Sequence, residues 1–128
     1  MKTMGKLLLV DDDVDLLKGL GVRLKASGYE VVYAADGVQA VAAARRERPD
    51  LILLDIGLPG GDGYVVMERL RTLGSAGPMP IIVISAKDHQ THRERSLKAG
   101  ASHFFQKPVD NAAVLAAIRE ILGEAPVV

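Results

Sequence analysis

The sequence predicts an α/β fold: a doubly wound, five-stranded parallel sheet in a (βα)5 arrangement, with helices on both faces. Short runs of Leu, Ile and Val alternate with longer segments whose apolar residues recur every three or four positions. Residues 51–54 and 81–84 are apolar throughout, as in strands that are covered on both sides. The strict alternation implies right-handed crossovers and therefore parallel strands.

The expected strands are five short segments rich in Leu, Ile and Val. They span residues 6–10, 30–34, 51–55, 81–85 and 102–106. Because the strands are buried on both faces, each following segment has to supply a helix that covers the sheet.

Apolar stripes at helical spacing predict the first two helices. The first stripe consists of Leu16, Leu17, Leu20 and Leu24. Gly28 is expected to stop this helix, because glycine favours helix ends. The second stripe consists of Val38, Val41 and Ala42. Pro49 limits the second helix, because proline disfavours α geometry at the preceding residue, Arg48.

Three further helices complete the pattern. The third carries the stripe Val65, Val66, Leu70 and Leu73 and ends near Gly74. The fourth, residues 90–99, is unusually polar. The fifth carries the stripe Val114, Leu115, Ile118, Ile121 and Leu122. Either Asp110 or Asn111 is expected to cap the fifth helix.

Length and composition set outer limits on the protein. The 128 residues fit one domain, with a core at about 6–122 and residues 123–128 as a tail or severed linker. The chain has no cysteine, and its 16 basic residues balance 16 acidic ones, so nothing favours nucleic acid or an anionic membrane as a partner. No segment approaches the ~20 apolar residues of a membrane span, and no signal peptide is recognisable. We expect a soluble, cytoplasmic protein.

Polar groups end four of the expected strands. These ends are Val10-Asp11-Asp12-Asp13, Leu54-Asp55, Ile84-Ser85 and Gln106-Lys107-Pro108. Parallel strands place such groups at one edge of the sheet, where open α/β folds bind their ligands. Three carboxylates, a hydroxyl and an ammonium in one pocket suit a divalent cation and a phosphoryl group.

Five markers occur in order along the chain: Asp11-Asp12 after an apolar strand, the stretch 55–63, Ser85-Ala86, Ala99-Gly100-Ala101 and Lys107-Pro108. In these markers the chain resembles the receiver domains of bacterial two-component response regulators, such as the single-domain chemotaxis regulators. The resemblance covers residues 7–122. It implies a flavodoxin-like fold with strand order 2-1-3-4-5.

The resemblance also implies residue roles. Asp55 would be the phosphoacceptor, taking a phosphoryl group from a phosphohistidine. Mg²⁺ would be held directly by Asp12, Asp55 and the backbone carbonyl of Gly57, and through water by Asp11, in keeping with its preference for oxygen ligands. As an alternative, one of the strand-end aspartates caps the first helix, a role that suits Asp13 best.

Ser85 and Lys107 would contact the phosphoryl oxygens in the family scheme. The peptide bond between Lys107 and Pro108 is typically cis in the family. Ser85 and the aromatic Phe104 would form the conformational switch. Each residue also has a simpler alternative. Ser85 would cap a helix, Lys107 would be a surface lysine, and Phe104 would be a buried strand residue.

The resemblance implies a signalling module rather than an enzyme, because only its own phosphorylation and dephosphorylation are expected. Its partners would be a sensor histidine kinase or phosphotransfer protein and a downstream target or effector domain, with a homodimer as a further candidate. Output would use the surface of helix 90–99, strand 102–106 and the last helix, including Arg93 and Arg95 near His103. The sequence does not distinguish a stand-alone regulator from part of a larger one.

Two other functions fit parts of the sequence. Asp11-Asp12-Asp13-Val14 also fits the nucleophile motif of haloacid-dehalogenase-like phosphatases, with Asp11 as nucleophile and Asp13 as general acid. That hypothesis leaves the stretch 55–60 unexplained, and the chain is short for that class. A phosphate-independent adaptor would usually lose an acidic, hydroxyl or lysine position, whereas all are present in this chain.

The histidines suggest no separate site. His89 and His92 have a spacing that can chelate a transition metal, but no neighbouring residue completes such a site. We expect both on a solvated helix face. His103 is expected to point outward or into a partner surface.

Overall fold

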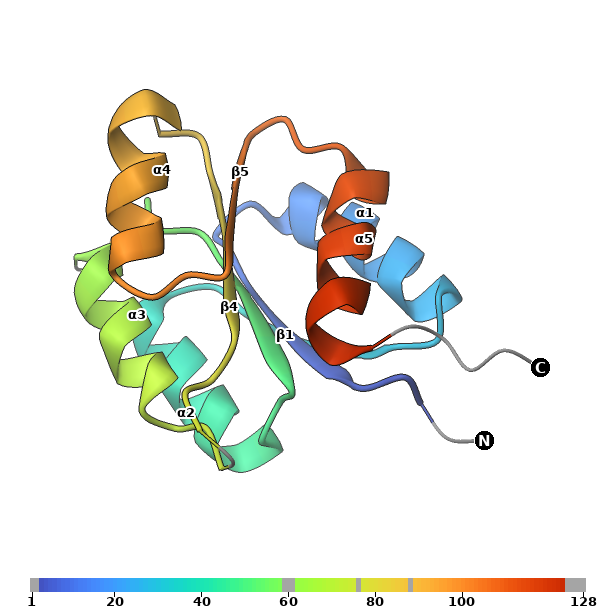
Figure 1. Ribbon diagram of the computed structural model, residues 1–128. Coiled ribbons are helices and arrows are strands. Elements are labelled where there is room, and N and C mark those ends of the chain that lie inside the picture. The colour runs from blue at the N-terminus through green and yellow to red at the C-terminus, as the bar shows by residue number, and fades with distance from the viewer. Residues whose placement is uncertain (1–2, 59–61, 76, 88, 124–128) are drawn as a thin grey trace.

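The computed structural model describes residues 3–58, 62–75, 77–87 and 89–123, which form alternating strands and helices (Figure 1). The strands are β1 (Lys6–Val10), β2 (Glu30–Ala34), β3 (Leu51–Leu54), β4 (Ile81–Ser85) and β5 (His103–Gln106). The helices are α1 (Val14–Ala26), α2 (Gly37–Glu47), α3 (Gly63–Arg71), α4 (His89–Lys98) and α5 (Asn111–Leu122). The predicted alternation is therefore confirmed.

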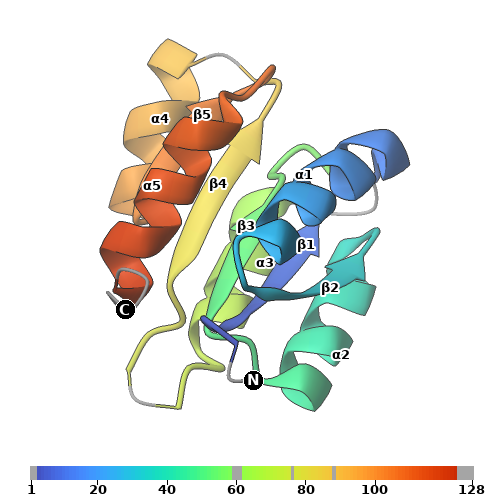
Figure 2. The ribbon, with the colours of Figure 1, turned by 90° about the vertical axis from the view of Figure 1, so that its right-hand side faces the viewer.

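All five strands are parallel, in the order β2-β1-β3-β4-β5 (Figure 2). The order confirms the expected 2-1-3-4-5 arrangement. The chain leaves β1 for β2 on one side and then returns to place β3 on the other side. This reversal makes the carboxyl ends of β1 and β3 the position where ligands bind in open α/β sheets.

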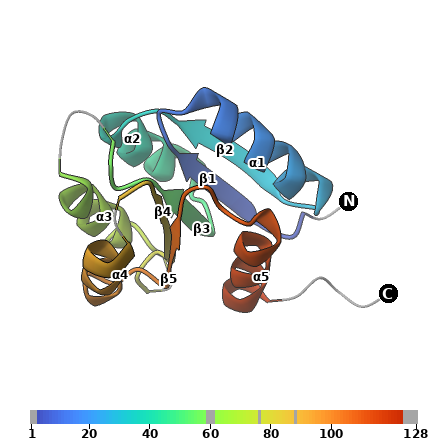
Figure 3. The same ribbon diagram turned by 90° about the horizontal axis from the view of Figure 1, so that it is seen from above.

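The helices form two layers, with α2, α3 and α4 on one face of the sheet and α1 and α5 on the other (Figure 3). Alternate residues of β1 supply both cores, because successive side chains of a strand point to opposite faces. Leu8 and Val10 pack on the α2 and α3 side. Leu7 and Leu9 pack on the α1 and α5 side. The sheet is covered on both faces, as its apolar runs predict.

Aspartates cap the amino ends of α1, α2, α3 and α5. Asp13, Asp36, Asp62 and Asp110 are the N-cap residues of α1, α2, α3 and α5, and each accepts a hydrogen bond from a backbone N–H of the first turn. Their carboxylates satisfy N–H groups that lack a partner within the helix. Of the two candidates for the α5 cap, the structure selects Asp110.

Helix and strand ends differ slightly from the expected ones. β3 ends at Leu54 and β5 begins at His103, so Asp55 and Ser102 lie just outside the ladder. Helix α3 ends at Arg71, before the expected Gly74. Arg48 adopts the left-handed region with φ 49°, which ends α2 directly before Pro49. Residues 59–61 of the family-like stretch and residues 124–128 of the expected tail lie outside the described residues.

Among the described helices, none has the length and apolar character that crossing a membrane requires.

Candidate functional site

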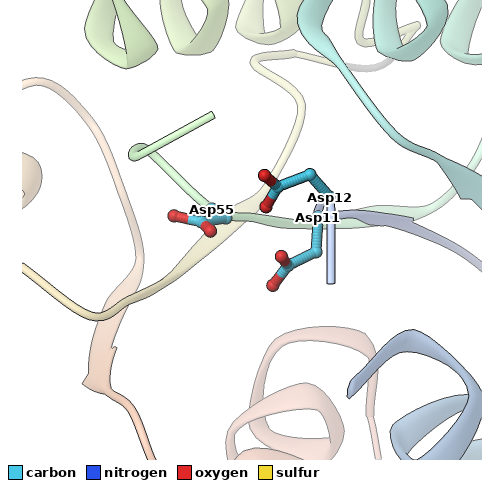
Figure 4. A group of neighbouring side chains, drawn as sticks. All are labelled: Asp11, Asp12 and Asp55. Atoms are coloured by element: carbon cyan, nitrogen blue, oxygen red, sulfur yellow. The ribbon is translucent and has the colours of Figure 1, made fainter. Parts of the chain in front are cut away.

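Four predicted residues meet at the carboxyl edge of the sheet, because each follows or ends a parallel strand. Asp11 follows β1, Asp55 follows β3, Ser85 ends β4 and Lys107 follows β5. One carboxylate oxygen from each of Asp11, Asp12 and Asp55 lies within 4.8 Å of the others. Figure 4 shows these three side chains grouped at the ends of β1 and β3.

Tight turns after the strands orient two of the carboxylates. Asp11 Oδ1 accepts a hydrogen bond of 2.9 Å from the N–H of Asp13. Asp55 Oδ1 accepts one of 2.7 Å from the N–H of Gly57. In each turn the backbone two residues further on holds the carboxylate, a geometry that aspartate favours. The second oxygen of each carboxylate is left to face the site.

Lys107 binds both of these remaining oxygens. Its Nζ lies 2.8 Å from Oδ2 of Asp11 and 3.1 Å from Oδ2 of Asp55. Burial alone would lower the pKa of Lys107, but its hydrogen bonds to the two carboxylates and their negative charges outweigh burial and raise the pKa. The ammonium is therefore charged at neutral pH. The surface-lysine alternative for Lys107 is wrong.

For Asp11, the effect of burial on the pKa outweighs the effect of the hydrogen bonds. It is 3% exposed, and burial raises the pKa of its carboxyl above the usual value, with a smaller rise from the charge of Asp55. The hydrogen bonds from Lys107 and from the N–H of Asp13 offset only part of that rise. Three carboxylates therefore share a single ammonium at this edge, and a cation bound between them would relieve their mutual repulsion.

The donor set fits Mg²⁺. All three clustered side chains are carboxylates, and Asp12 is exposed to solvent while Asp11 and Asp55 are buried. Oxygen ligands that partly face water suit a cation that keeps several water molecules in its octahedron. Among the described residues, no other group of three or more His, Cys, Asp or Glu side chains gathers so closely.

Ser85 is fully buried at the end of β4. Its Oγ accepts a hydrogen bond of 3.0 Å from the N–H of Lys87, and its carbonyl accepts one of 2.8 Å from the N–H of Lys107. The backbone hydrogen bond between Ser85 and Lys107 thus holds the residue with the hydroxyl next to the residue with the ammonium. Within the described residues, this hydrogen bond joins Ser85 Oγ to the loop before α4.

Three other predicted positions lie near this edge. Phe104 is 8% exposed and belongs to the core on the α4 side, so the structure places it as a buried strand residue. The peptide bond between Lys107 and Pro108 is cis. The backbone of Gly57 is exposed, and a Cβ at this position would lie 3.2 Å from Oδ1 of Asp55.

Asp13 does not face the cluster, because its Oδ1 accepts the N–H of Leu16 and caps α1. The helix-cap alternative for Asp13 therefore describes its contacts. The phosphatase alternative needs Asp13 as a general acid, and the cap occupies that carboxylate.

The sequence patterns did not predict a contact between α3 and α4 that the structure shows. The Tyr64 hydroxyl lies 2.8 Å from Nδ1 of His92, and the guanidinium of Arg95 lies 3.9 Å from the centre of the Tyr64 ring. The expectation of a solvated face is wrong for His92, which is half-buried. Arg95 faces α3 rather than the expected output surface. His103 Nε2 lies 3.6 Å from Glu120 of α5.

A doubly wound sheet with three carboxylates and a lysine at its switch point can hold a cation beside an anionic group. The family model "Response regulator receiver domain" matches residues 7–119. The chain therefore belongs to the response regulator receiver domains of two-component systems, which accept a phosphoryl group on an aspartate.

Relatives and solved structures agree with this family. Response regulator PleD of Caulobacter vibrioides is 38% identical over 91% of this chain and 26% of its own length. Transcriptional regulatory protein PrrA of Mycobacterium tuberculosis is 38% identical over 94% of this chain and 51% of its own length. Protein PilH of Pseudomonas aeruginosa is 33% identical over 94% of this chain and 99% of its own length. The chain thus spans about a quarter of PleD, half of PrrA and nearly all of PilH.

Two solved receiver domains are similar in structure. One, from Methanospirillum hungatei JF-1, has a TM-score of 0.83 and 32% identity over 91% of this chain and 92% of its own. The other is the receiver domain of sensor histidine kinase PA1611 from Pseudomonas aeruginosa PAO1, with a magnesium ion in its active site cleft. Its TM-score is 0.81, with 35% identity over 94% of this chain and 98% of its own.

Proposed function

We propose that Asp55 is the phosphoacceptor of this receiver domain and that it works with Mg²⁺ held by Asp11, Asp12, Asp55 and the backbone carbonyl of Gly57. One observation carries the proposal: Asp55 shares a cluster with two other carboxylates while the ammonium of Lys107 contacts its Oδ2. The magnesium in the cleft of the similar PA1611 receiver supports the choice of ion.

The chemistry is a phosphoryl transfer between two nucleophiles. An oxygen of Asp55 forms a bond to phosphorus as the bond from phosphorus to the donor's histidine nitrogen breaks, and the electron pair of that bond returns to the ring nitrogen, which releases the unmodified histidine. Mg²⁺ supplies charge neutralisation at the phosphoryl oxygens. Lys107 supplies a second positive charge, and Ser85 supplies a hydroxyl at the end of the neighbouring strand. We assign Ser85 and Phe104 to the conformational response.

The partners follow from the same proposal. A sensor histidine kinase or phosphotransfer protein would donate the phosphoryl group, and a target or effector domain would bind the surface of α4, β5 and α5, with a second copy as a further candidate. We place the module in the cytoplasm as a single domain of residues 1–128, with no external substrate turned over. The contact between His103 and Glu120 lies on the β5 and α5 part of that surface.

The test is intact mass after incubation with acetyl phosphate, with and without Mg²⁺. Wild type should gain one phosphoryl group only with Mg²⁺, and Asp55→Asn should gain none. Asp36→Asn is the matched control, because Asp36 caps α2 without belonging to the cluster and asparagine caps a helix equally well. Phosphorylation of Asp55→Asn, or none in wild type, would overturn the assignment.

A further inference from the structure

A groove runs between α2 and α3. These two helices lie on the face of the sheet opposite α5 (Figure 3). Its volume is about 520 Å³. The groove is lined by Gly37, Val38, Val41, Ala42, Arg45, Asp62, Val65, Val66 and Arg69. None of these residues belongs to the carboxylate cluster, so the groove is separate from the phosphorylation site.

Exposed aliphatic side chains from both helices line the groove. Val38 is 83% exposed and Val65 is 49% exposed, and they are among the large apolar side chains most open to solvent in the described chain. The two helices approach closely at their amino ends, where a Cβ at Gly37 would lie 2.8 Å from Cγ2 of Val66. Exposed aliphatic side chains on two neighbouring helices form the kind of surface that receives a helix.

Two arginines without carboxylate partners lie toward the carboxyl ends of the helices. Arg45 of α2 and Arg69 of α3 form no ion pair or side-chain hydrogen bond within the described part of the chain. Other arginines of the same helices are paired: Arg46 with Glu47, and Arg71 with Glu68. The groove therefore joins exposed aliphatic side chains to two unneutralised positive charges, and the carboxylate that also lines it, Asp62, lies at the amino end of α3, where it caps that helix.

We propose that the α2 and α3 groove docks an amphipathic helix of a partner protein, which places aliphatic side chains on Val38 and Val65 and carboxylates beside Arg45 and Arg69. The charge of the two guanidinium groups selects an acidic partner. From Val38 to Arg45 the groove spans about two helical turns, or about 10 Å. A second copy fits less well, because two concave grooves facing one another would leave a void.

The test uses synthetic 14-residue peptides that are stapled to be helical and labelled with fluorescein. Leucines at i, i+3 and i+7, or at i, i+4 and i+7, form the apolar face, and two glutamates or two lysines follow at one end. Fluorescence anisotropy should show that the full chain binds a glutamate peptide about tenfold more tightly than its lysine counterpart. The double variant Arg45→Glu/Arg69→Glu should reverse that preference.

Val38→Asp should weaken binding of the glutamate peptide by at least about tenfold, because it puts a negative charge among the aliphatic side chains that line the groove. Val22→Asp is the matched control, since Val22 is 68% exposed on α1, on the other face of the sheet, and should leave binding unchanged. Thermal melts and acetyl phosphate labelling would verify that each variant is folded.

Three results would overturn the proposal. They are no saturable binding of any peptide up to roughly 1 mM, equal affinity for glutamate and lysine peptides, and undiminished binding to Val38→Asp. Sedimentation velocity of the chain without peptide tests the alternative occupant. A dimer that Val38→Asp dissociates would assign the groove to a second copy instead.

Discussion

Lys107 and Asp55 are 52 residues apart in the chain, yet Nζ of the lysine lies 3.1 Å from Oδ2 of the aspartate. The same ammonium contacts Asp11 at 2.8 Å. In the protein without metal, Lys107 is therefore the counter-charge of two buried carboxylates. A metal ion binding to the same carboxylates would share them with this ammonium, which links metal affinity to Lys107.

Lys107→Met should destabilise the metal-free protein by about 1–3 kcal/mol, because it leaves Asp11 and Asp55 without their cation. The cost is below that of a fully buried pair, since the Lys107 side chain is 19% exposed. The same change should raise Mg²⁺ affinity several-fold, because one positive charge is removed from the site. Urea unfolding with and without Mg²⁺, and calorimetric titration, measure the two effects.

Lys98→Met is the control for that variant, since its ion pair with Glu94 is exposed on α4 and such pairs contribute little. It should change neither stability nor Mg²⁺ affinity measurably. If Lys107→Met were as stable as wild type without metal, the contacts of Lys107 with Asp11 and Asp55 would contribute no net free energy to folding.

Asp11→Asn should stabilise the metal-free protein in a pH-dependent way. The raised pKa means that the folded state holds the Asp11 proton more tightly than the unfolded state does. The wild-type protein therefore loses stability as pH rises from the usual value of 3.8 through the raised pKa, whereas the Asp11→Asn variant does not. The advantage of the variant should be absent in acid, grow across that window and then stay constant.

Urea midpoints of wild type and Asp11→Asn measured from pH 3 to pH 8 check this prediction. Added Mg²⁺ should reverse the ranking at neutral pH, because only wild type keeps the full carboxylate set and gains stability from the bound ion. An advantage of the variant that fell with rising pH would contradict a raised pKa for Asp11.

Gly63→Ala should destabilise the protein by about 2–4 kcal/mol. A Cβ at Gly63 would overlap the carbonyl oxygen of Ile56 and lie 2.6 Å from the Cα of Ile56. These are backbone atoms, so they cannot rotate away as a side chain could. Ile56 sits between Asp55 and Gly57, so acetyl phosphate labelling should slow as well. Urea unfolding and labelling rates measure both effects.

Gly19→Ala is the opposite case and serves as the control. Gly19 lies inside α1 with no atom within 4 Å of an added Cβ, so alanine should stabilise the protein by about 0.5–1 kcal/mol. Equal effects of the two substitutions would show that helix propensity, rather than the Ile56 contact, controls both positions.

Tyr64→Phe should cost about 1 kcal/mol, because it removes the hydrogen bond to His92 while the ring stays under Arg95. Tyr33→Phe is the matched control, since Tyr33 is 41% exposed and its hydroxyl has no hydrogen bond within the described residues. Thermal unfolding compares the two. A larger loss in Tyr33→Phe would show that the contact between α3 and α4 does not stabilise the fold.

Most residues of the candidate site could be predicted, because they lie at the ends of strands. Asp11, Asp55, Ser85 and Lys107 each occupy the carboxyl end of an apolar run, and parallel pairing brings such ends to one edge. The contact of Tyr64 with His92 and Arg95 was not predictable in the same way. Two helices carry it, and the rotation of each helix about its axis depends on how it packs on the sheet.

The sequence by itself determined the order of the elements, the parallel sheet and the set of side chains at its edge, because apolar periodicity is local and strand direction follows from the crossovers. Only the tertiary structure decided that Asp11 is buried against Lys107 while its neighbour Asp12 is exposed. It also decided that an apolar groove remains open between α2 and α3. Burial, ion-pair distances and grooves depend on the relative positions of distant segments, which no local pattern specifies.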